Sequence, residues 1–249
     1  MTRRLILLAC LTVLAACASE PKDRYLDPAD VLYREAHQSL VDGHYRRAEM
    51  ELRQIMSHYP FTDFSVQAHL DVLHVLLQLN RPEELAEEAD RFIRENPRHP
   101  DIDYAYYMKG LAFFPEMTNP VRQLVNIDAA RQDVENAKTS FRNFSQLVSR
   151  FPDSKYSKDA RLRMIDLKKR IARHQIHVAD YYMRRGAWVS ALQSAYRVLT
   201  EFQGTPAEID ALMVMIESYE ALGLEKLAET PRRILAANPD REPVVLGDD

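Results

Sequence analysis

Three observations in the sequence predict an all-α fold, a solenoid built from about five helical hairpins. Apolar residues recur with helical periodicity from about residue 28 to residue 240, and no segment alternates long enough to predict a strand. The chain has only 6 glycines, and its prolines stand where helical segments end. A short pattern of small, aromatic and proline residues also repeats along the chain. These observations together favour stacked helix pairs over a single compact bundle.

The repeated pattern is a glycine five residues before an alanine, at three places in the chain. The pairs are Gly43 with Ala48, Gly186 with Ala191, and Gly223 with Ala228. An aromatic residue follows two of the glycines, as Tyr45 and Trp188, and Pro60 and Pro239 close two of the units. Small residues let two helices cross closely, glycine permits the turn, and proline ends the second helix. This order resembles the tetratricopeptide repeat, a helix–turn–helix of about 34 residues.

Two further units carry weaker versions of the pattern, at residues 64–97 and 104–152. In the second of these, Gly110 and Ser140 stand 30 residues apart, whereas the matching alanines Ala36 and Ala48 are 12 apart. The difference predicts an insertion of about 18 residues, a loop that includes a short helix packed on the solenoid. We therefore expect five repeats over 28–240, with an N-terminal half at 28–152 and a C-terminal half at 153–240.

The first residues predict a secretory signal that is not part of the fold. Arg3 and Arg4 precede an unbroken run of apolar or small residues at 5–16. That run is too short to span a bilayer, which takes about 20 residues, and suits the core of a signal peptide. Residues 1–16 are therefore expected to be removed, and residues 241–249 are expected to form a flexible tail.

The signal ends in Leu14-Ala15-Ala16-Cys17, which resembles a bacterial lipobox cleaved just before the cysteine. We expect Cys17 to be lipidated, with residues 17–27 as a tether; the alternative is an ordinary signal with an incidental cysteine. Acyl chains on Cys17 would hold the protein to a membrane, because each buried methylene contributes about 0.8 kcal/mol. The next residues, Ala18-Ser19, lack the aspartate that usually retains such proteins at the inner membrane. The periplasmic face of the outer membrane is the expected location.

Charge and motif content exclude several classes of function. Loss of two arginines with the signal moves the formal net charge from −4 to −6, and a nucleic-acid binder would carry a dominant basic surface. The sequence lacks H-E-x-x-H, G-x-S-x-G and phosphate-binding glycine motifs, so we expect no enzyme activity, no catalytic residue and no cofactor. His174 and His177 are spaced for one helical face but lack further ligands, so no metal site is predicted.

Aromatic and polar residues of the first two repeats form one candidate partner-binding set. Its members are Tyr33, His37, Phe61, Phe64 and Asp71. Aromatic side chains along a solenoid groove would suit an extended peptide with an aromatic end. The alternative is that they form inter-repeat core. A structural role is favoured for Phe61 and for the neighbouring Tyr59, because both flank the helix-ending Pro60.

A basic run between residues 155 and 173 forms the second candidate set. The residues selected from it are Arg161, Lys168, Lys169 and Arg173. The run suits an acidic partner or lipid headgroups, but it also fits a solvated helix face with Asp159 and Asp166 interleaved. The sequence leaves both readings open. The acidic residues at 83–90 open a helix, where the helix dipole favours acids, so we expect them to be structural.

Several local strings resemble the BamD family, lipoproteins of the β-barrel assembly machinery of the Gram-negative outer membrane. They are Tyr59-Pro60-Phe61, Asp90-Arg91-Phe92-Ile93-Arg94, Tyr107-Met108 with Gly110-Leu111, and Arg185-Gly186-Ala187-Trp188. The resemblance covers nearly all of the chain after the signal, although Thr62 stands where the family commonly has glycine. It implies a scaffold that helps fold and insert barrel proteins into the outer membrane.

The resemblance also implies a set of partners. The expected ones are the periplasmic domains of the barrel-forming subunit, other assembly lipoproteins and unfolded barrel proteins. The N-terminal repeats would bind the C-terminal signal of unfolded barrel proteins, and the C-terminal repeats would bind the barrel subunit. The alternative functions are a repeat lipoprotein of another envelope assembly, such as a pilus or secretin, and a regulator of cell-wall enzymes.

Overall fold

The computed structural model describes residues 28–114, 134–243 and 245. Ten α-helices and no strand occur in these ranges. In chain order the helices are α2 (Ala29–Val41), α3 (Tyr45–His58), α4 (Asp63–Gln78), α5 (Pro82–Glu95), α6 (Ile102–Ala112), α10 (Val134–Arg150), α11 (Ser157–Met183), α12 (Trp188–Glu201), α13 (Ala207–Ala221) and α14 (Glu225–Ala236). None of these helices is both long and apolar enough to cross a membrane.

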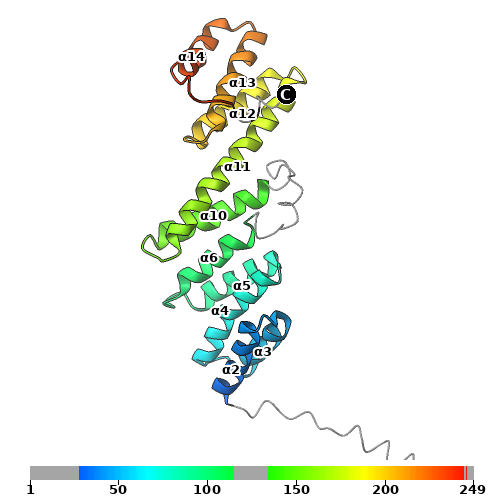
Figure 1. Ribbon diagram of the computed structural model, residues 1–249, viewed down its shortest axis with the longest axis vertical. Coiled ribbons are helices and arrows are strands. Elements are labelled where there is room, and N and C mark those ends of the chain that lie inside the picture. Colours follow the sequence, from blue (N-terminus) through cyan, green and yellow to red (C-terminus); the bar gives the residue numbers. More distant parts are fainter. Residues whose placement is uncertain (1–27, 115–133, 244, 246–249) are drawn as a thin grey trace, which may run out of the picture.

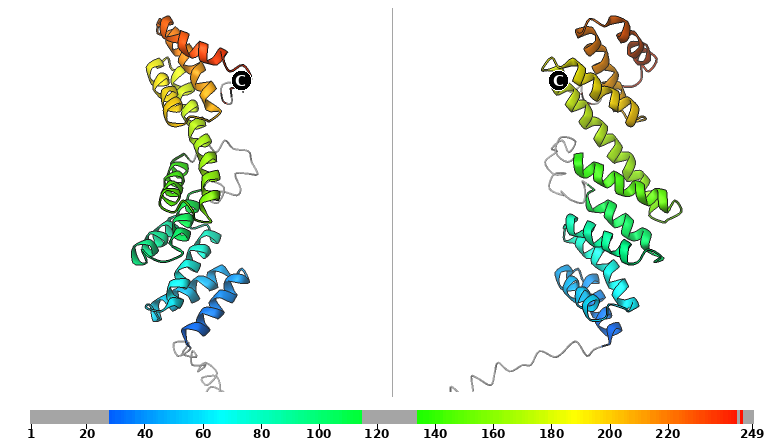
Figure 2. Two further views of the ribbon diagram at one scale, coloured as in Figure 1. Left: turned by 90° about the vertical axis from the view of Figure 1, so that its left-hand side faces the viewer. Right: turned by 180° about the vertical axis from the view of Figure 1, so that it is seen from behind.

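The helices form five stacked hairpins in an elongated solenoid (Figure 1). The pairs are α2–α3, α4–α5, α6–α10, α11–α12 and α13–α14, and each helix packs against the next along the chain. Both views of Figure 2 show the hairpins stacked along the long axis, with α2 and α14 at opposite ends. The predicted fold class, an all-α solenoid of about five hairpins, is confirmed.

The turn glycines and crossing alanines occupy the places that the repeat pattern predicts. Gly43, Gly186 and Gly223 have φ angles of +75°, +69° and +70°, a left-handed conformation that only glycine adopts without cost. Ala48 and Ala191 are fully buried where the second helix of each hairpin crosses the first. A larger side chain at either alanine would push the two helices apart.

The third hairpin joins helices that are distant in sequence, α6 and α10. Ser140 Oγ donates a hydrogen bond to the carbonyl of Gly110 at 2.8 Å, and Asn143 Nδ2 donates to the carbonyl of Lys109 at 3.1 Å. These bonds hold the pair together across the long insertion between them. The insertion itself, with the short extra helix expected in it, lies outside the described residues.

The longest helix, α11, belongs to two separate hydrophobic cores. Leu167 and Ile171 lie in the first core, which extends from α2 to this point, whereas Ala172 and Ile176 lie in the second core with α12 and α13. The two cores therefore meet inside a continuous helix of 27 residues. The sequence predicts a division into two halves near residue 152, which lies in the connection before α11. The boundary between the two cores comes later in the chain, inside α11.

One expectation about proline is wrong. Pro231 lies inside α14 and is buried, whereas the sequence pattern places prolines only at helix ends. Proline lacks the N–H that would bond to the preceding turn, so α14 continues with one hydrogen bond fewer at this position. Its buried ring adds apolar surface to the interior of the last hairpin.

Candidate functional site

Four of the five residues in the N-terminal candidate set lie together between α2 and α4. Tyr33 donates a hydrogen bond from its hydroxyl to Asp71 Oδ2 at 2.6 Å, and His37 Nδ1 lies 3.7 Å from the same oxygen. The Tyr33 ring stacks on His37 with centroids 5.9 Å apart and tilts against Phe64 at 5.8 Å. We call Tyr33, His37, Phe64 and Asp71 the α2–α4 cluster.

The α2–α4 cluster is ordered and half-open to solvent. Burial raises the pKa of the Tyr33 hydroxyl, and the hydrogen bond to the Asp71 carboxylate raises it further, so the hydroxyl stays protonated and keeps donating. His37 and Phe64 remain exposed at their outer edges. The cluster therefore joins the first two repeats and also presents an aromatic surface, which fits both readings of the sequence.

Phe61 lies apart from that cluster, on the rim of a groove. The groove has a volume of about 780 Å³ and is formed by α3, the turn after it, the start of α4 and the end of α5. Phe61 is 100% exposed, so the structural role favoured for it at the helix end is wrong; Tyr59 packs against the core there instead. Met56, Pro60 and Val66 give the groove its apolar lining.

The two faces of α4 thus carry different parts of the predicted set. Phe64 and Asp71 contact α2, whereas Ser65 and His69 line the groove with α3 and α5. Residues four or seven apart on a helix share a face, which is why Ser65 lies beside His69 and Phe64 beside Asp71. Phe61 lies in the turn before α4. The structure consequently brings together four of the five residues and leaves Phe61 beside the groove.

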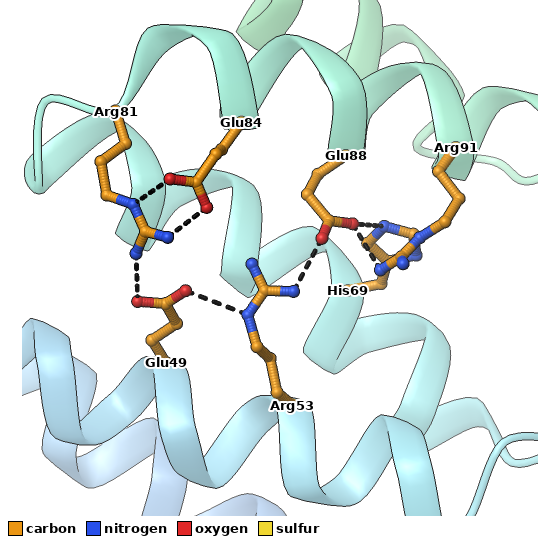
Figure 3. A network of polar contacts seen from close by, with 7 residues as sticks. All are labelled: Glu49, Arg53, His69, Arg81, Glu84, Glu88 and Arg91. Atoms are coloured by element: carbon orange, nitrogen blue, oxygen red, sulfur yellow. Dashed lines mark hydrogen bonds and ion pairs between the residues drawn. The ribbon is translucent and has the colours of Figure 1, made fainter.

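A charged network links the first repeat to the second (Figure 3), and three of its members, Arg53, His69 and Arg91, line the groove. Glu88 of α5 is its centre: the carboxylate accepts hydrogen bonds from Arg53 Nη1 at 2.7 Å and pairs with His69 Nε2 at 3.1 Å, and Arg91 also contacts it. Glu49 accepts hydrogen bonds from Arg53 Nε at 3.0 Å and from Arg81 at 2.6 Å. The network spans α3, α4 and α5.

The network holds Glu88 in its ionised form. Burial alone would raise the pKa of this carboxyl, but hydrogen bonds from His69 and Arg53 and the charges of Arg91 and Arg53 outweigh burial. The resulting pKa is about 2, below the ordinary 4.5. Sequence reasoning missed this centre, because Glu88 stands in an acidic stretch that resembles an ordinary helix start and its partners are distant in sequence.

The basic run lies along α11, and the structure divides it into paired and unpaired side chains. Arg163 donates to Asp159 at 2.5 Å and Arg170 donates to Asp166 at 2.7 Å. Burial would lower the pKa of Arg163, but its hydrogen bond to Asp159 raises it overall. These two arginines are therefore engaged within the solenoid.

The four residues selected from the basic run also lie on α11. Arg161 donates to the carbonyl of Pro152 at 3.1 Å, and Lys168 donates to the carbonyl of Gln203 at 2.7 Å. Lys169 and Arg173 are exposed, and no acidic side chain of the described residues pairs with any of the four. Uncompensated positive charge thus gathers on one side of this helix.

The described residues contain no group of three or more His, Cys, Asp or Glu side chains suited to a metal ion. His174 and His177 both take part in other contacts. The groove and the two surfaces above present apolar, aromatic and charged groups. Surfaces of this kind along a helical solenoid suit extended or helical partners.

A family model and several named relatives match most of this chain. A family model described as YfiO, outer membrane lipoprotein, matches residues 26–234. The chain is 33% identical to the outer membrane protein assembly factor BamD of Vibrio cholerae over 93% of this chain and 96% of that relative.

The chain belongs to this family. Two other BamD relatives agree: that of Haemophilus influenzae is 31% identical over 96% of this chain and 91% of its own length. That of Xylella fastidiosa (strain Temecula1) is 30% identical over 97% of this chain and 83% of its own length. The match to the YfiO family begins just before α2 and ends within α14, so the α2–α4 cluster, the groove and α11 all lie inside the region that defines the family.

Proposed function

We propose that the protein is a lipid-anchored scaffold of the β-barrel assembly machinery at the periplasmic face of the outer membrane, acting by binding and without catalysis. The observation that carries the proposal is the family match over 26–234, together with relatives named as outer membrane protein assembly factors. The described solenoid supports it, because stacked hairpins offer long surfaces to several partners at once.

Attachment through Cys17 is part of the proposal. The lipobox-like Leu14-Ala15-Ala16-Cys17 supports lipidation, and residues 17–27 would connect the lipid to α2. More than one acyl chain is needed for stable anchoring, and the resemblance to bacterial lipoproteins implies three chains on this cysteine. The solenoid would then stand beside the membrane with its first hairpin nearest to the anchor in the chain.

The N-terminal half, 28–152, is proposed to bind the C-terminal signal of unfolded barrel proteins. Phe61 at the rim of the groove, with Met56 and Val66 inside it, would hold an aromatic side chain of an extended peptide. The outer edges of His37 and Phe64 offer a second aromatic contact on the neighbouring face of α4.

The C-terminal half, 153–240, is proposed to dock on the periplasmic domains of the barrel-forming subunit. The support is the uncompensated basic side of α11, with Arg161, Lys168, Lys169 and Arg173. An exposed charged contact weakens as added salt shortens the Debye length from about 10 Å at 0.1 M. Other assembly lipoproteins would share the remaining surface.

Affinity purification of the tagged protein from detergent-solubilised membranes tests the whole proposal. The expected result is the large barrel-forming subunit as the main co-purifying protein, in amounts that fall as salt is raised. Recovery of pilus, secretin or cell-wall enzyme components in its place would overturn the proposal. A tagged lipoprotein without helical repeats serves as the control for nonspecific recovery.

A further inference from the structure

A line of seven residues along α11 repeats with alternating spacings of three and four. The residues are Leu162, Ile165, Lys169, Ala172, Ile176, Ala179 and Met183. This spacing places all seven on one stripe of the helix, and it is the spacing by which one helix packs lengthwise against another. We call this stripe the α11 seam.

The α11 seam is covered along its C-terminal part and open along its N-terminal part. Ala172, Ile176 and Ala179 are fully buried in the second core against α12 and α13. Leu162 and Ile165 are 60% and 53% exposed. The cover stops beside Lys168, whose Nζ reaches the carbonyl of Gln203 in the connection between α12 and α13. One seam therefore serves helix packing over half its length and has no described helix over the other half.

Positive charge surrounds the open part of the seam. Lys158 and Arg161 precede Leu162, and Lys169 and Arg173 follow Ile165, all of them exposed. No acidic side chain of the described residues pairs with these four, whereas the arginines at 163 and 170, toward the other side of α11, are paired. A chain with a formal net charge of −4 thus presents a local basic frame around two apolar side chains.

We infer that the open part of the α11 seam is a docking site for an acidic amphipathic helix of another protein. The apolar side chains of that helix, spaced three and four apart, cover Leu162 and Ile165 and continue the packing that α12 and α13 make farther along. Its flanking Glu and Asp residues pair with Lys158, Arg161, Lys169 and Arg173. The inference deepens the docking role proposed for the C-terminal half, and it rests on that proposal only for which partner supplies the helix.

The geometry of the open seam favours a protein helix over a membrane surface. A helix that lies in a membrane interface needs a broad apolar face along most of its length. The open seam offers two apolar side chains, and the same stripe then continues under α12 and α13. A site of that width fits the seam of one partner helix, and the basic frame gives the partner its acidic character.

The test uses the full mature chain with Cys17→Ala, which keeps the protein off membranes. The probes are a fluorescent synthetic helix with Leu at three–four spacing and Glu on its flanks, a scrambled peptide of the same composition, and anionic phosphatidylglycerol vesicles. The variant is Leu162→Asn with Ile165→Asn, and the control is Leu227→Asn, whose side chain is 52% exposed on α14. All substituted positions are exposed, and equal melting curves verify the fold of each variant.

We expect the amphipathic probe to bind more tightly than the scrambled one. Its dissociation constant should rise at least about tenfold in the double variant and stay unchanged in the control. Equal binding of both peptides, equal affinity in the double variant, or loss of vesicle binding as the main effect of the substitutions would overturn the inference.

A parallel titration with the periplasmic domains of the barrel-forming subunit separates the two proposals. If those domains bind parent and double variant equally, the seam is not the docking site but the docking role survives. If those domains fail to bind the parent while the amphipathic probe still binds the seam, the proposed docking role fails and the inference about the seam stands.

Discussion

The aromatic ring of Phe144 lies directly against Gly110, where a β-carbon on the glycine would be 2.4 Å from the ring. The same crossing carries the hydrogen bond from Ser140 Oγ to the Gly110 carbonyl. Phe144 is fully buried, so moving its ring away from an added methyl group would disturb the packing around it. In the third hairpin, α6 and α10 thus pack closely because the ring of Phe144 contacts the backbone of Gly110, which has no side chain.

We predict that Gly110→Ala destabilises the protein. The added methyl group overpacks the crossing of α6 and α10, at a cost of about 1–3 kcal/mol in the free energy of unfolding. Urea unfolding followed by circular dichroism measures it. The control is Gly223→Asn: no atom lies within 4 Å of the added β-carbon, and asparagine tolerates the left-handed conformation there. An unchanged urea midpoint for Gly110→Ala would show that this contact is not as close as described.

Ala191→Leu should also destabilise the protein, by about 1–3 kcal/mol, because Ala191 is fully buried where α12 crosses α11. Val189→Leu is the matched control, since this side chain lies two residues away on the same helix and is 59% exposed. Thermal unfolding of the two variants provides the comparison. Equal melting temperatures for Ala191→Leu and the parent would place the crossing elsewhere.

The pH dependence of stability should report on Glu88. Its pKa is about 2 when folded and ordinarily 4.5, so the unfolded chain binds this proton first as pH falls. The stabilisation is therefore complete above about pH 4.5 and is lost between pH 4.5 and pH 2.

Glu88→Gln should lower the free energy of unfolding at pH 7 by about 1–3 kcal/mol, because Arg53 and Arg91 lose their shared carboxylate. The difference from the parent should shrink as pH falls below 4.5. Glu87→Gln, at an exposed neighbouring position, should follow the parent at every pH. Denaturant titrations across this pH range measure the free energy of unfolding of each variant. If the difference between Glu88→Gln and the parent stays constant with pH, the stabilisation comes from another group.

Phe61→Ser should weaken binding of a peptide with a C-terminal aromatic residue by roughly tenfold, equivalent to about 1.4 kcal/mol. It should leave the melting temperature unchanged, because the Phe61 side chain is 100% exposed. Met50→Ser, at another exposed apolar position in the first hairpin, is the control and should bind like the parent. Fluorescence anisotropy with the full chain measures both, and equal affinities would remove the groove from the proposed function.

Cys17→Ala should abolish acyl labelling and release the protein into the soluble periplasmic fraction. The reason is that the thiol at the end of Leu14-Ala15-Ala16-Cys17 is the proposed acceptor of the lipid. Metabolic labelling with a fatty acid and membrane fractionation provide the readout. Cys10→Ala, inside the expected signal, should still be labelled, and continued labelling of the Cys17→Ala variant would point to Cys10 instead.

The fold could be predicted from local sequence, because each hairpin carries its own signals. The glycines at 43, 186 and 223 mark turns, and Ala48 and Ala191 mark crossings. Within a hairpin, the turn glycine and the crossing alanine lie less than a dozen residues apart in the sequence. The third hairpin was harder, because Gly110 and Ser140 meet across an insertion and only their residue types connect them.

The candidate site was less predictable because its geometry depends on which face of each helix meets a neighbour. Tyr33 and Asp71 could be grouped by position in the repeats, but their hydrogen bond joins two hairpins. Glu88 has partners on three helices, and periodicity within α5 contains no information about them. Phe61 has the apolar character of a core residue, and only the path of the turn shows that it points into solvent.

The length of α11 has a consequence for geometry between partners. Its 27 residues extend about 40 Å at 1.5 Å per residue, and no loop interrupts them where the two cores meet. An unbroken helix resists bending, so the first and second cores keep a fixed separation and a fixed angle. A partner bound to the N-terminal hairpins and another bound to the C-terminal hairpins are therefore held at a set distance from each other. Removing one turn from α11 would shorten the helix by about 5.4 Å, and it would also remove side chains that pack in one of the two cores or belong to the docking surface on α11.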